Sequence, residues 1–133
     1  MKTLLHNMKY NLKHLIVSLL LTGACTIASA QQLRVVIAGL SHDHIHGILR
    51  QFNNGKVNVV GIAEPDKQLQ LKYSKQYHLP DSLFANDLKE LLMAKKPDAV
   101  LGYNAVAEHV AIVRICAPLG IPVMVEKDRK SVV

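Results

Sequence analysis

The sequence contains no tryptophan, and aromatic residues make up only 5% of it. It also lacks a basic stripe, because residues 31–127 hold 11 Lys and Arg against nine Asp and Glu, spread along the chain, for a formal charge of +2. Nucleic-acid-binding domains concentrate positive charge on one face, and those that bind single strands add aromatic side chains that stack on bases. We therefore expect no nucleic-acid partner.

Cysteine is scarce as well, since the chain has only Cys25 and Cys116. Cys25 lies in an N-terminal segment that we expect to be removed, which leaves Cys116 without a partner for an internal disulfide. Cys116 falls within an apolar helical pattern. That setting is typical of a cysteine buried as a small hydrophobic residue.

The apolar run of the N-terminal segment, residues 15–21, is shorter than the roughly 20 residues that a membrane-spanning helix needs. It follows three lysines and precedes the small-residue segment Ala28-Ser29-Ala30. These features predict a secretory signal peptide over residues 1–30, export to the periplasm, and no stable membrane span after cleavage. An uncleaved anchor and a lipoprotein attached through Cys25 are the alternatives.

The last residues, 128–133 (DRKSVV), match the translation of a common sequencing adapter up to its stop codon. We expect the natural protein to continue beyond Lys127, so that the chain is the N-terminal part of a longer protein. Residues 128–133 would then be a non-native or disordered tail. A genuine short polar tail is the alternative.

Between these ends, apolar strand patterns alternate with helical patterns. Continuous apolar runs are typical of parallel strands buried on both faces, and strands alternating with helices predict an α/β fold. We expect a Rossmann-like doubly wound parallel sheet with right-handed crossovers over residues 31–127. The expected strands are 33–38, 57–63, a short one at 83–84, 99–101 and 121–125, and the expected helices are 43–52, 67–77, 87–95 and 106–118.

Side chains at the helix starts and faces refine this prediction. Asp66 and Asn86 are residue types that cap helices, so we expect them to cap the second and third helices. In the fourth helix, Val110, Ile112, Val113 and Ala117 are expected to form the apolar side.

The segment 33–47 (LRVVIAGLSHDHIHG) is typical of the first strand, turn and helix of a dinucleotide-binding unit, with Glu64 placed 25 positions after Gly39. Gly39 permits a tight turn, and Ser41 and His42 lead into a helix whose N-terminus can bind a pyrophosphate. Glu64 can accept the ribose hydroxyls. A carboxylate there repels a 2′-phosphate, so NAD is favoured and NADP stays possible.

The glycine pattern of this turn is degraded. Ser41 stands where the second glycine of the fingerprint would be, and His44 stands at the third. Ser41 keeps its N–H and adds a hydroxyl donor. We expect His44 to crowd the helix against the strand or to displace the phosphates.

A rival hypothesis uses the alternating histidines His42, His44 and His46 together with Asp43 as a metal site of a hydrolase. It needs an extended backbone over residues 42–46, so that alternate side chains share a face. No later cluster completes such a site. We keep this hydrolase as an alternative and assign no metal ligand.

Further motifs follow downstream. Residues 96–100 read KPDAV, Asn104 is followed by His109, Gly120 is followed by Val123, and the last strand ends in Glu126-Lys127. Together with VVIAGLSHDH and VVGIAEPD, they make residues 33–127 resemble the N-terminal nucleotide-binding domain of the Gfo/Idh/MocA family (glucose–fructose oxidoreductase, inositol dehydrogenase). The proline that follows Glu-Lys in that family is absent here.

The resemblance implies an NAD(P)-dependent oxidoreductase that oxidises a sugar or polyol hydroxyl by hydride transfer. It implies that Lys127 lies near the nicotinamide and supports proton transfer, that Asn104 and His109 line the cofactor groove, and that Glu126 helps to bind the cofactor. The second, substrate-binding domain of the family is missing, so the chain itself is expected to be inactive. A homo-oligomer is possible for the full-length protein.

An exported, non-catalytic relative that binds a sugar or a nucleotide is the second alternative. It is motivated by the degraded glycine pattern and by the scarcity of NAD outside the cytoplasm.

Overall fold

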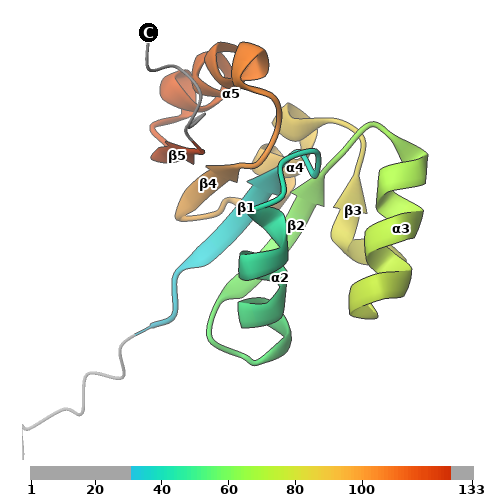
Figure 1. The fold of residues 1–133 in the computed structure, drawn as a ribbon. Coiled ribbons are helices and arrows are strands. Elements are labelled where there is room, and N and C mark those ends of the chain that lie inside the picture. Colours follow the sequence, from blue (N-terminus) through green and yellow to red (C-terminus); the bar gives the residue numbers. More distant parts are fainter. Residues whose placement is uncertain (1–30, 127–133) are drawn as a thin grey trace, which may run out of the picture. The chain divides into compact units, whose positions relative to one another are not determined.

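Five parallel strands form one sheet in the order β3-β2-β1-β4-β5 (Figure 1). The computed structural model describes residues 31–126. The strands are β1 (Arg34–Ala38), β2 (Asn58–Ala63), β3 (Phe84–Ala85), β4 (Ala99–Gly102) and β5 (Val123–Val125). Residues 35–38 of the central strand β1 are all buried, as its continuous apolar sequence predicts. The expected α/β fold is confirmed.

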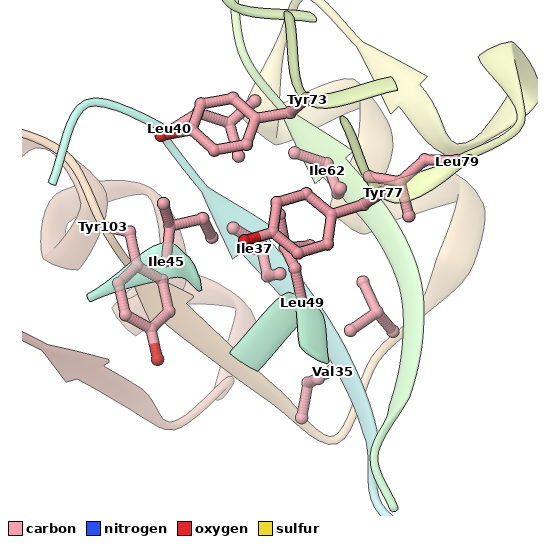
Figure 2. Packing of buried hydrophobic residues seen from close by; sticks show 11 residues of the cluster. Val35, Ile37, Leu40, Ile45, Leu49, Ile62, Tyr73, Tyr77, Leu79 and Tyr103 are labelled. Carbon is pink, nitrogen blue, oxygen red and sulfur yellow. The ribbon is translucent and has the colours of Figure 1, made fainter. Parts of the chain in front are cut away.

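Helices cover both faces of the sheet, and alternate side chains of β1 serve the two faces. On one face, α2 (Ile45–Asn53) and α3 (Lys67–Tyr77) pack over Val35 and Ile37, in the cluster drawn in Figure 2. On the other face, α4 (Leu88–Lys95) and α5 (His109–Cys116) pack over Val36 and Ala38. This arrangement explains why the sequence of β1 is apolar without alternation.

The fourth predicted helix is broken into three pieces. The α-helix α5 is flanked by the 3₁₀ turns η2 (Val106–Glu108) and η3 (Ala117–Leu119). Ile112 and Cys116 form its buried side, whereas Val110 and Val113 are 58% and 45% exposed. The predicted apolar face was therefore right only in Ile112 and wrong in these two valines and in Ala117, which is exposed in η3. Apolar residues surround this helix on most sides, so their spacing did not identify the side that faces the sheet.

The helix starts agree with the sequence in one case and differ in the other. Asp66 caps α3, with its carboxylate accepting a hydrogen bond of 2.8 Å from the N–H of Gln68. The expected cap Asn86 was wrong, because Asp87 caps α4 and accepts from the N–H of Glu90 at 2.7 Å. The side chain of Asn86 is turned to Gln70 instead. A 3₁₀ turn, η1 (Asp81–Leu83), precedes β3.

Several expectations fall outside residues 31–126 and stay predictions. They are the signal peptide over 1–30, the role of Lys127, the tail 128–133 and the two domain boundaries. Within the described range, Cys116 is a buried free thiol. None of the helices there has the length and apolarity that crossing a membrane requires.

Candidate functional site

The carboxyl ends of all five strands lie level with one another. The register pairs Ala38 with both Ala63 and Gly102, and it pairs the last residues of the two outer strands with these neighbours. The residues that follow the strands therefore form a row along one edge of the sheet. In the order β3 to β5 they are Asn86, Glu64, Gly39, Tyr103 and Glu126. Ligands of doubly wound sheets bind along this edge.

The crevice of the site lies between β1 and β4, where the chain leaves the sheet toward opposite faces. After β1 it turns to α2, and after β4 it turns to α5. Gly39 has a φ of +82° and passes so close to Asn104 that only a glycine fits there without a shift. The predicted role of Gly39 as the tight-turn residue agrees with this geometry.

The loop between Gly39 and α2 uses some of its backbone donors internally. The N–H of Gly39 donates to Ala63 O at 2.9 Å, and that of His42 donates to Tyr103 O at 2.8 Å. The N–H of Leu40 donates to a carboxylate oxygen of Glu64 at 2.8 Å. Within residues 31–126, the N–H groups of Ser41 and Asp43 make no hydrogen bond. These two donors lie just before the N-terminus of α2, where an anion is stabilised.

Glu64 is 5% exposed and braces two segments of the edge. One carboxylate oxygen accepts from Leu40 N–H, and the other accepts from Asp66 N–H at 2.9 Å. Each oxygen keeps a lone pair for another donor. Glu64 thus has both a structural contact and the capacity to accept ribose hydroxyls.

A cavity of about 330 Å³ runs along this part of the edge. Its walls include four residues expected in the cofactor site, Gly39, Ser41, Glu64 and Asn104. Leu69 and Leu88 supply apolar wall. The volume is at the lower end of the range for small-molecule sites, about 300–1,000 Å³. The cavity can therefore hold part of a dinucleotide.

The three remaining expected cofactor residues lie outside the walls of this cavity. His42 lies in the loop before α2. His109 places its Nε2 3.3 Å from the backbone oxygen of Asn104. Glu126 follows β5 and pairs with His44, with 3.0 Å between Glu126 Oε2 and His44 Nδ1.

The contact between His44 and Glu126 changes the expectation for the third fingerprint position. His44 has helical backbone angles, and its side chain is exposed. It reaches across the edge to β5 and does not pack between helix and strand, so the expected crowding was wrong.

Glu126 also affects Tyr103, which follows β4. The pKa of the Tyr103 hydroxyl is raised, first by burial and second by the nearby Glu126 carboxylate.

The histidines of the loop have separate partners. His46 Nδ1 lies 2.6 Å from the hydroxyl of Tyr77 on α3, whereas His44 faces β5. Residues 42–44 form a turn and α2 begins at Ile45, so the extended backbone that the metal hypothesis requires is not formed. Across residues 31–126, no three His, Cys, Asp or Glu side chains are grouped so that they could hold a metal ion.

The structure adds two residues that the sequence did not indicate. Gln70 is nearly buried, and its side-chain NH₂ donates to the backbone oxygen of Glu64 and to Asn86 Oδ1. Asn86 lines the cavity. Its place two residues after the short predicted strand 83–84 was the signal, but its residue type also suited a helix cap.

The residues present fit the adenosine and phosphate portion of a dinucleotide. The close approach at Gly39, the two available N–H groups and the Glu64 carboxylate each match one part of it. Asn104 adds a buried Oδ1 that has no hydrogen-bond partner among the described residues.

Comparison with known proteins gives a likeness in structure only. No protein-family model and no curated protein matches the sequence. Among solved structures, the chain is similar to myo-inositol 2-dehydrogenase from Lactobacillus plantarum, with a TM-score of 0.60 and 18% identity over 73% of this chain and 28% of that one. It is also similar to the dehydrogenase MviM from Clostridium difficile, with a TM-score of 0.58 and 23% identity over 77% and 33% of the two chains.

The chain thus spans about a third of the length of these two dehydrogenases. The likeness agrees with the resemblance to the Gfo/Idh/MocA family that the sequence motifs indicate. At these identities the comparison establishes the fold, and the described residues have the Rossmann-like α/β fold of part of these dehydrogenases.

Proposed function

We propose that residues 31–127 are the nucleotide-binding domain of an exported NAD(P)-dependent oxidoreductase of the Gfo/Idh/MocA type, which acts on a sugar or polyol hydroxyl. One observation carries the proposal: Gly39, Ser41, Glu64 and Asn104, from three separate segments, line a single cavity at the carboxyl edge. The names of the two similar solved structures, both dehydrogenases, support it.

When bound, NAD(P) supplies the hydride acceptor. The residues of this chain bind and orient it. The N–H groups of Ser41 and Asp43 and the N-terminus of α2 hold phosphate oxygens, and Glu64 accepts the ribose hydroxyls. Glu64 carries negative charge at the ribose, which favours NAD over NADP by repelling a 2′-phosphate. Lys127 is proposed to move the proton of the substrate hydroxyl.

Calorimetric titration of the full chain with NAD and NADP tests the binding part of this proposal. We expect NAD to bind about tenfold or more tightly than NADP, because like charges placed together cost several kcal/mol. Absence of binding by both dinucleotides would overturn the proposal.

The variant Asp43→Asn tests whether the phosphates bind at the N-terminus of α2. Asp43 is exposed and directly precedes the N-cap of α2, so its carboxylate repels a phosphate bound there. Removing this charge should tighten NAD binding about two- to tenfold. The matched control Asp81→Asn changes an exposed carboxylate in η1, outside the walls of the cavity, and should leave the affinity unchanged.

A second candidate, the non-catalytic relative, is favoured by the loop hydrogen bonds. Gly39, Leu40 and His42 already donate their N–H groups within the protein, so fewer donors face a pyrophosphate. Binding of a sugar by the full chain, without binding of NAD, NADP or AMP, would support this candidate over the first.

A further inference from the structure

The orientation of the Gln70 carboxamide is determined by its two neighbours. Its NH₂ group faces the backbone oxygen of Glu64, which can only accept a hydrogen bond. Its oxygen accepts from the ammonium group of Lys67 at 3.0 Å, and an ammonium can only donate. Both contacts require the same orientation. Gln70 therefore presents a second N–H of the same NH₂ group to Asn86.

That N–H in turn orients Asn86. Asn86 Oδ1 accepts it at 3.1 Å, so the amide nitrogen of Asn86 points away from Gln70. Asn86 is exposed and lines the cavity, and its Nδ2 makes no hydrogen bond to any residue within 31–126. The free N–H group that Asn86 offers to a ligand is thus a donor, while its oxygen is turned to Gln70, which occupies one of the two lone pairs.

The row of residues along the edge places Asn86 at the base end of a nucleotide. Gly39 begins the loop with the phosphate donors, and Glu64 follows on the next strand, at the ribose position. Asn86 follows the strand beyond it, and the backbone joins the two, since Glu64 N–H donates to Ala85 O at 2.9 Å. Each step along the row is one strand spacing of about 4.8 Å.

The cavity wall near Asn86 suits a flat ring. Leu69 and Leu88 are partly buried and give it apolar surface, while Asn86 supplies one fixed donor. The ring nitrogens of adenine (N1, N3 and N7) are acceptors that match this donor. We propose that Asn86, held by Gln70, donates a hydrogen bond from Nδ2 to a ring nitrogen of the adenine. This inference rests on the proposed function.

A set of nucleotides that each lack one ring nitrogen tests the contact. The full chain is titrated with AMP and with its 1-deaza, 3-deaza and 7-deaza analogues. One analogue should bind about three- to tenfold more weakly than AMP, which is the contribution of one hydrogen bond. The other two should bind like AMP.

Two variants assign this difference to Asn86 and Gln70. Asn86→Asp keeps an oxygen for Gln70 and replaces the outward NH₂ with an oxygen, so the preference for AMP over that analogue should disappear. Gln70→Met fills a similar volume without orienting Asn86, and it should abolish the preference although Asn86 is intact. Asn54→Asp, which adds the same charge in the residue following α2, should keep the preference.

The amide protons give a second measurement that needs no ligand. By NMR, the side-chain NH₂ protons of Gln70 should exchange slowly with water and those of Asn86 should exchange fast. The opposite ranking would overturn the inference. Equal affinities of wild type for all four nucleotides would overturn the base contact alone, whereas absence of binding by all four would overturn the proposed function together with it.

Discussion

A β-carbon on Gly39 would lie 2.5 Å from the Cβ of Asn104 and 2.9 Å from its Cα. The turn after β1 and the segment after β4 are therefore in close contact, and the contact is possible because residue 39 is a glycine. Because Asn104 meets Gly39 with backbone and Cβ atoms, neither can move aside without shifting β4 or the turn.

Replacing this glycine should destabilise the protein strongly. We expect Gly39→Ala to lower the free energy of unfolding by about 3 kcal/mol or more, from the positive φ and the clash together. Gly55→Ala is the matched control, since Gly55 has a φ of +68° but no heavy atom within 4 Å of the place that a β-carbon would occupy. It should cost only about 1–2 kcal/mol in urea unfolding, and equal losses for the two variants would contradict the contact.

Gly47 should behave in the opposite way. It lies inside α2, its φ is not positive, and a β-carbon there would meet no atom within 4 Å. Gly47→Ala should therefore raise the free energy of unfolding by about 0.5–1 kcal/mol, because alanine loses less conformational entropy in a helix. Thermal unfolding followed by circular dichroism measures this gain. A lower melting temperature would show that a β-carbon at position 47 does clash with neighbouring atoms.

Glu64→Gln tests the two hydrogen bonds that the Glu64 carboxylate accepts, one from Leu40 in the loop after β1 and one from Asp66 at the start of α3. The glutamine amide keeps one acceptor and places its NH₂ against a backbone N–H, so one buried donor loses its partner. We expect a loss of about 2–3 kcal/mol in urea unfolding. The control Glu90→Gln removes an exposed carboxylate in the first turn of α4 and should cost less than about 1 kcal/mol.

Alkaline pH should destabilise the protein through Tyr103. Burial, and then the Glu126 carboxylate, raise the pKa of the Tyr103 hydroxyl above its ordinary value of 10.0 in the folded state. The unfolded chain then releases this proton first, so the contribution of Tyr103 is fully present below about pH 10 and is lost as the pH rises through the higher folded pKa. Stability should fall by up to about 1.4 kcal/mol per pH unit from this group.

Urea unfolding of wild type and Tyr103→Phe between pH 9 and pH 11 measures this effect. The phenylalanine variant has no hydroxyl to titrate at this position, so its stability should decline less steeply. Parallel pH profiles for the two proteins would show that Tyr103 does not contribute.

Much of the fold followed from local patterns in the sequence. Four of the five strands are apolar runs with a glycine or proline close to one or both ends, and the predicted range 67–77 of α3 is also its observed range. Asp66 caps that helix. It could be identified from the sequence because it follows Pro65, which cannot continue a strand ladder, and no other capping residue stands beside it. Asn86 and Asp87 are both good capping residues, so the sequence did not identify which of them caps α4.

The site was less predictable because its contacts join distant residues. His44 meets Glu126, which lies 82 positions away, and Glu64 meets Leu40 across two strands. No local pattern encodes such pairs. Gln70 was missed for a similar reason, since its partners become visible only when α3 lies beside the start of α4.

The brace formed by Glu64 has a consequence for redesign. Exchanging the acidic residue at this strand end is the obvious way to convert an NAD-dependent protein to NADP, yet here the same carboxylate supports the turn after β1. Asp66 is also committed, as the cap of α3. Under the proposed function, cofactor specificity and folding are therefore coupled at both acids, whereas Pro65, the exposed residue between them, has no such side-chain contact to lose.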